Sequence, residues 1–118
     1  MALYLIAFND EWTPDLTMDE LRERGRRGMA VIDEMTTKGV FVFSDGGLDA
    51  STAICSVVPD GDEPVFSDGP YVETKEFLGG FAVVDVADDE AATMWAGKIA
   101  EACGWPQEVR RFGHLAAE

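Results

Sequence analysis

The sequence is poor in the residues that build metal sites and nucleophile sites. Its 118 residues include one histidine, His114, and two cysteines, Cys55 and Cys103. The cysteines lie far apart and have no CxxC partner, so we expect two reduced thiols rather than a disulfide or a zinc site. The acidic residues do not follow the D-x-D-x-D-G spacing of a calcium loop. The sequence therefore predicts neither a metal nor a cofactor.

Long apolar runs and basic residues are also scarce. No apolar run is long enough for a membrane helix, which needs about 20 residues, and the start, MALYLIAFNDEW, lacks the basic segment and cleavage site of a signal peptide. Nine basic residues stand against 23 acidic ones, which gives a net charge of −14. A negative field of this size disfavours nucleic acids and anionic membranes as partners. These features predict a cytoplasmic protein.

Hydrophobic residues, at 47%, suffice for the core of a single domain over residues 1–118. The expected elements are a strand over 2–8, a helix from Thr17 to about Lys38, strands over 40–43 and 51–58, a short hairpin, a strand over 81–86, a helix after Asp88 or Asp89, and a strand over 108–112. If the hairpin and one neighbouring strand are set aside, this order matches a split βαβ plan. The sequence therefore predicts an α+β, ferredoxin-like sandwich.

Local patterns add detail to these elements. Thr17 and Glu20 have the spacing of a capping box at the start of the first helix. The buried face of that helix is expected to consist of Met18, Leu21, Met29, Ile32 and Met35. The second helix is expected to end at Gly104 and to have an apolar stripe that consists of Ala92, Trp95, Ile99 and Ala102. Val65-Phe66 and Tyr71-Val72 are expected to form the two arms of the hairpin, around a corner at Asp68-Gly69-Pro70. Gly79-Gly80 predict a bulge or a close approach of the backbone.

Three of the expected strands are apolar on both sides. Residues 3–8, 40–43 and 81–84 do not alternate between apolar and polar side chains, whereas two helices cover only one face of a sheet. A second copy, packed sheet against sheet, would bury the other face. The sequence therefore predicts a two-fold homodimer, a dimeric α/β barrel with clefts at its ends. The alternative is an apolar face that stays exposed.

The stretch DGPYVETKEFLGGF, residues 68–81, closely resembles the signature of the YCII-related family, in its subgroup named for an Asp-Gly-Pro-Phe motif. Tyr71 replaces the phenylalanine of that motif. The matching residues are Asp68, Gly69, Pro70, Glu73, Lys75, Glu76, Gly79, Gly80 and Phe81. The resemblance covers essentially the whole chain. It implies a ferredoxin-like fold, a dimeric α/β barrel and, more faintly, the small-molecule lyase or dehydrochlorinase chemistry of broader YCII-like proteins.

The same stretch supplies the candidate site residues. Asp68 opens a constrained turn, and a partly buried carboxylate there is suited to proton transfer; its alternative role is to cap nearby amides in the turn. Tyr71, Glu73 and Lys75 are the candidate ligand-binding residues, although Glu73 and Lys75 also fit a structural ion pair. The resemblance implies a His–Asp pair in the lyase-like relatives. Here the sole histidine, His114, lies in the C-terminal tail, away from any such pair unless a partner subunit places it in a cleft.

Several functions remain open at this point. The first is a homodimer that binds an unknown small molecule in a cleft, with cofactor-free acid/base chemistry such as elimination or isomerisation. The second is a non-catalytic binding or regulatory module, because genes of the Asp-Gly-Pro-Phe subgroup often accompany extracytoplasmic-type sigma factors. The barrel architecture by itself also fits a cofactor-free oxygenase, but a shared fold is weak support for an activity.

Overall fold

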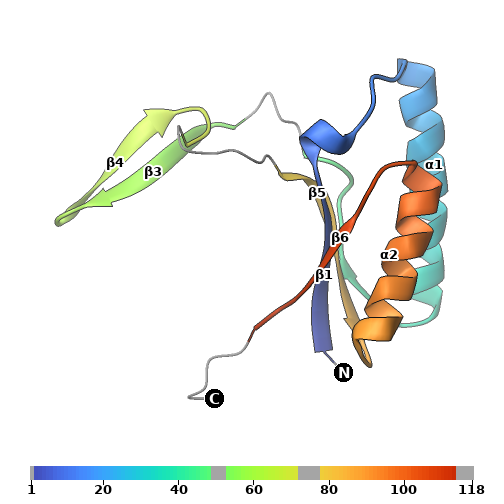
Figure 1. The fold of residues 1–118 in the computed structure, drawn as a ribbon. Helices are drawn as coiled ribbons and strands as arrows, with labels where there is room; N and C mark the ends of the chain where they lie inside the picture. Colours follow the sequence, from blue (N-terminus) through green and yellow to red (C-terminus); the bar gives the residue numbers. More distant parts are fainter. Residues whose placement is uncertain (1, 49–52, 72–77, 114–118) are drawn as a thin grey trace.

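The computed structural model describes residues 2–48, 53–71 and 78–113. In chain order, the elements are β1 (Ala2–Asn9), the 3-10 turn η1 (Asp10–Trp12), α1 (Met18–Thr37), β2 (Phe41–Phe43), β3 (Cys55–Asp60), β4 (Glu63–Asp68), β5 (Leu78–Val86), α2 (Asp89–Cys103) and β6 (Glu108–Arg111). Figure 1 shows α1 and α2 side by side on one face of the main sheet.

The main sheet has the strand order β2-β5-β1-β6, and every neighbouring pair is antiparallel. The strands on either side of α1, β1 and β2, are separated by β5, which is the arrangement of a split βαβ unit. This order is compatible with a ferredoxin-like fold. The prediction of an α+β fold is therefore confirmed.

The core lies between the helices and the face of the sheet that they cover. Alternate residues of the two central strands point into it, as the two-residue period of a strand requires. The buried residues are Tyr4 and Ile6 of β1, Ala82, Val84 and Val86 of β5, Val31 and Met35 of α1, and Ala92, Trp95, Ala96 and Ile99 of α2. The predicted stripe of α2 is confirmed, with Ala102 partly buried beside it.

The predicted capping box of α1 is confirmed. The backbone N–H of Glu20 donates to Thr17 Oγ1 at 3.1 Å, and the backbone N–H of Thr17 donates to Glu20 Oε1 at 2.9 Å. These two bonds satisfy N–H groups that the first turn leaves without helical partners. The hydrogen bonds from Thr17 also hold the pKa of Glu20 below its usual value.

The predicted buried face of α1 is wrong in its N-terminal half. Met18, Leu21 and Met29 are 65%, 42% and 54% exposed. The helix is turned so that Gly28 faces α2, where a Cβ atom would lie 3.5 Å from Cys103 Sγ. The face of α1 that packs on the core is therefore the one that carries Val31 and Met35, with Gly28 against α2.

The structure has a hairpin that the sequence analysis did not predict. β4 pairs with β3, and the register runs from Cys55 opposite Asp68 to Asp60 opposite Glu63. The chain reverses at Gly61 (φ 63°) and Asp62, so Pro59 and Asp60 lie in the strand and not in the turn. Asp-Gly turn residues occur at both ends of β4, and the apolar pattern did not decide between them. The second expected arm includes Val72, which lies outside the described residues.

The prediction for Gly79-Gly80 is confirmed. Gly80 pairs with Phe8 and Leu78 pairs with Asn9, so Gly79 is the extra residue of a bulge. A Cβ atom on either glycine would come within 2.8 Å of the Phe8 ring. The ring therefore lies directly on the backbone of β5, and side chains at these two positions would displace it.

Candidate functional site

The face of the main sheet away from the helices is apolar over β1 and most of β5, as predicted, whereas β6 places Glu108 and Arg110 on it, opposite Ala7 and Leu5. We call it the open face. The alternation of the buried core positions and the pairing of Phe43 with Val83 place Leu3, Leu5, Ala7, Phe43 and Val83 on it. Leu3 is 40% exposed and Phe43 is 53% exposed. The strands therefore carry apolar side chains in both directions, and the described part of the chain leaves the second set in contact with water.

A polar residue interrupts the open face near one end. Asp85 lies opposite Leu3, and its Oδ1 atom is buried without a hydrogen-bond donor among the described residues. Buried carboxylate oxygens normally have a donor. Among the described residues, this oxygen therefore keeps its capacity to accept a further hydrogen bond.

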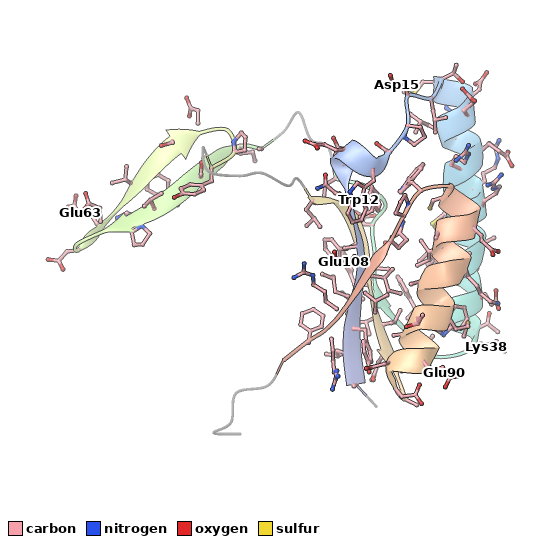
Figure 2. All side chains as sticks on the ribbon, in the orientation of Figure 1. Trp12, Asp15, Lys38, Glu63, Glu90 and Glu108 are labelled. Atoms are coloured by element: carbon pink, nitrogen blue, oxygen red, sulfur yellow. The ribbon has the colours of Figure 1, made fainter. Side chains whose placement is uncertain are left out.

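A hollow of about 320 Å³ lies on the open face at the end where β1 runs into η1. Its lining consists of Leu5, Ala7, Phe8, Asn9, Trp12, Leu78, Glu108 and Arg110. Trp12 and Leu78, which are 37% and 50% exposed, form part of its apolar wall. Figure 2 shows Trp12 and Glu108 toward the end of the sheet from which β3 and β4 also project. The volume suits a small organic molecule.

The charged groups of this hollow come from β6. Arg110 Nε donates to Glu108 Oε1 at 2.5 Å, and both side chains are substantially exposed. The two residues share a face because they lie two apart on a strand, with the half-buried Val109 between them pointing to the core. A guanidinium binds planar anions with two parallel hydrogen bonds. The hollow therefore combines apolar walls with an Arg110–Glu108 ion pair, in which the guanidinium keeps further N–H donors for a carboxylate or sulfonate.

A second hollow, of about 490 Å³, lies at the N-terminal end of α2. Here Tyr4 donates its hydroxyl hydrogen to Asp89 Oδ1 at 2.5 Å, and Arg111 Nη2 lies 3.5 Å from the other oxygen of Asp89. The hydrogen bond to the Asp89 carboxylate raises the pKa of Tyr4 above its usual value. These contacts tie β1, α2 and β6 together, which gives the Tyr4 hydroxyl a structural partner.

The residues singled out from the sequence lie elsewhere. Asp68 is exposed at the end of β4, opposite Cys55, and Tyr71 is 48% exposed just beyond the turn. Gly69 has φ 78°, and its N–H donates to Ile54 O at 3.2 Å, which holds the corner. Neither Asp68 nor Tyr71 lines the hollow on the open face of its own chain.

Three further residues that the sequence analysis named, Glu73, Lys75 and His114, lie outside the described residues. In the described ranges, no three or more His, Cys, Asp and Glu side chains gather to hold a metal ion. In the same ranges, neither helix is both long enough and apolar enough to cross a bilayer.

The sequence analysis missed Trp12, Glu108 and Arg110. They come from two segments about 100 residues apart, and only the pairing of β1 with β6 brings them together. The alternation of residues 108–112 does place Glu108 and Arg110 on one face of a strand, and that was the one signal available in the sequence.

The profile of the YCII-related domain family matches residues 3–104 of the chain. The chain belongs to the YCII-related domain family. The resemblance read from residues 68–81 is confirmed at the level of the family. This YCII-related chain is also 26% identical over 102 residues to the uncharacterized protein R00369 of Rhizobium meliloti (strain 1021), a match that covers 86% of this chain and 82% of the relative.

Proposed function

We propose that this YCII-related protein is a homodimer that binds a small anionic molecule with an apolar body in a cleft of the open face. The observation that carries the proposal is the hollow of about 320 Å³, which has apolar walls and an arginine, Arg110, whose Nε is bonded to Glu108 and whose remaining N–H groups are available to an anion. Pairing of two open faces would close its open side and exclude water. Exclusion of water strengthens the attraction between the guanidinium and an anion.

The dimensions of the chain support the dimer. The radius of gyration is 16.5 Å, whereas a compact domain of this length has about 13.5 Å. The accessible surface is 8362 Å², whereas a compact monomer of this mass exposes about 6,300 Å². The excess, about 2,000 Å² per chain, is of the size that obligate homodimers bury.

Cofactor-free acid/base chemistry, such as elimination or isomerisation, is the catalytic form of the proposal. Asp68 is its proton-transfer group, and Tyr71, Glu73 and Lys75 orient the substrate. Asp68 is exposed in the single chain, so this form requires that the second copy bring Asp68 to a cleft. Its test is to monitor the turnover of a bound compound by mass spectrometry. The Asp68→Asn variant must abolish this turnover while it still binds the compound.

One observation favours the second candidate, a non-catalytic binding or regulatory module associated with an extracytoplasmic-type sigma factor. The hollow is lined by β1, η1, β5 and β6, and Asp68 is not part of its lining. In that case the site binds without proton transfer. Copurification with a sigma factor, together with unchanged ligand binding in Asp68→Asn, separates this candidate from the enzyme.

Binding in the hollow is tested with anilinonaphthalene sulfonate, which joins apolar rings to an anionic group. We expect saturable fluorescence enhancement on the wild-type protein and about 10-fold or more weaker binding to Arg110→Gln, because a hydrogen bond to a charged group contributes about 1.5–3 kcal/mol. Arg26→Gln is the matched control, since Arg26 is exposed on α1 and pairs with Glu23. Equal affinities of the two variants for the dye would show that Arg110 does not contribute to the site, and they would contradict the proposed binding of an anion.

A further inference from the structure

We propose that the β3–β4 hairpin is an arm that packs one of its faces onto the second copy of the chain. This inference rests on the homodimer proposed above. It adds that the β3–β4 hairpin of each chain contacts the other chain. Figure 1 shows the hairpin projecting from the main sheet on the side away from α1 and α2, which is the side of the open face. Two sheets that pack face to face lie about 10 Å apart, so a second copy on the open face lies on the same side as the hairpin.

The hairpin has one face that is almost free of polar groups. Residues directly opposite each other in the register share a face. One face consists of Cys55, Val57, Pro59, Pro64, Phe66 and Asp68, and the other of Ser56, Val58, Asp60, Glu63, Val65 and Ser67. Val57 and Phe66 form a cross-strand pair at the centre of the first face and are 49% and 65% exposed. We call this first face the apolar face of the hairpin.

The hairpin has little support from its own chain. Its internal bonds include the pairing of β3 with β4 and the bond from Ser56 Oγ to Gly69 O at 2.9 Å. Among the described residues, no hydrogen bond or ion pair joins the hairpin to the main sheet or to the helices. A two-stranded hairpin that packs on nothing is marginally stable at best. Contact with another surface would supply the missing layer.

Charge and area favour a second copy as that surface. The chain carries 23 acidic residues, yet the apolar face of the hairpin carries one charge, Asp68 at its base. The other acids of this region, Asp60, Asp62 and Glu63, gather at the tip and on the opposite face. The excess surface of about 2,000 Å² per chain includes the hairpin as well as the open face. By two-fold symmetry, each chain would contribute one hairpin and receive one.

The test compares two double variants of the hairpin by sedimentation velocity over a dilution series. We expect Val57→Ser/Phe66→Ser to weaken dimerisation by about 100-fold, because two symmetric copies of an apolar contact are lost. Val58→Ser/Val65→Ser, the neighbouring cross-strand pair on the opposite face, is the matched control and should change the dissociation constant by less than about 3-fold. An equal effect of the two variants, or a larger effect of the control, overturns the assignment.

A photo-crosslink distinguishes contact with the second copy from contact with the same chain. Benzoylphenylalanine at position 66 should give a covalent dimer on a denaturing gel after illumination. Crosslinks that form only within one chain overturn the inference. If the wild-type protein is dimeric and the Val57→Ser/Phe66→Ser variant dimerises equally well, the hairpin inference fails while the proposed homodimer stands. A monomeric wild-type protein would contradict both the hairpin inference and the proposed homodimer.

Discussion

Replacement of Val83 by Asp is expected to convert the protein into a folded monomer. Val83 lies on the central strand β5, opposite Leu5, in the middle of the open face. In the dimer, the variant would bury one uncompensated carboxylate from each chain, and each such charge costs about 3–5 kcal/mol. The dissociation constant should therefore rise by about 1,000-fold or more. Sedimentation velocity at micromolar concentration measures the change directly.

The control for this variant places the same charge on the opposite side of the molecule. Met94 lies on α2 and is 45% exposed, so Met94→Asp adds an identical charge outside the proposed interface. It should leave the dimer intact. Circular dichroism must show helices in both variants, because Val83 is half-buried in the single chain and tolerates a solvated carboxylate there. If Val83→Asp remains dimeric, the open face is not the interface.

Replacement of Trp95 by Ala is expected to cost about 3–5 kcal/mol of stability, the range for a buried tryptophan. Trp95 is 2% exposed in the core, and Lys98 Nζ lies 5.2 Å from the centre of its ring. A loss of this size is a large fraction of the 5–15 kcal/mol that typically separates a folded domain from its unfolded state. Urea unfolding, at a protein concentration that keeps the oligomeric state constant, measures the loss.

Met94→Ala is the matched control for Trp95→Ala, because the two residues are adjacent on α2 and Met94 is exposed whereas Trp95 is buried. An exposed Met to Ala change should alter the free energy of unfolding by less than about 0.5 kcal/mol. A small effect of Trp95→Ala would mean that α2 does not pack on the sheet through this residue. The account of the core would then be wrong.

Local signals in the sequence predicted most of the main sheet and both helices. The capping box at Thr17 and the stop at Gly104 (φ 91°) act through neighbouring backbone groups, so residue types alone reveal them. The bulge at Gly79 was predictable for a similar reason, since glycine tolerates the close approach of the Phe8 ring. Apolar runs located the strands because successive side chains point to opposite faces, and in β1 and β5 the residues toward the core and most of those toward the open face are apolar.

The errors concern features that depend on distant contacts. Which stripe of α1 is buried depends on its packing against α2, where Gly28 faces Cys103, about 75 residues away in the sequence. The pairing of β4 with β3 was missed because turn residues flank β4 on both sides. The hollow was missed because Trp12 and Arg110 meet only after β6 pairs with β1. In each case the sequence contains the residues but not the contact between them.

The central claim is that a single chain cannot cover its open face and that two chains must pair. Sedimentation velocity of the wild-type protein, diluted from tens of micromolar to tens of nanomolar, tests it most directly. We predict a species of twice the 12.9 kDa chain mass throughout the micromolar range, with monomer appearing only on strong dilution. A folded species of single-chain mass at micromolar concentration would contradict the claim.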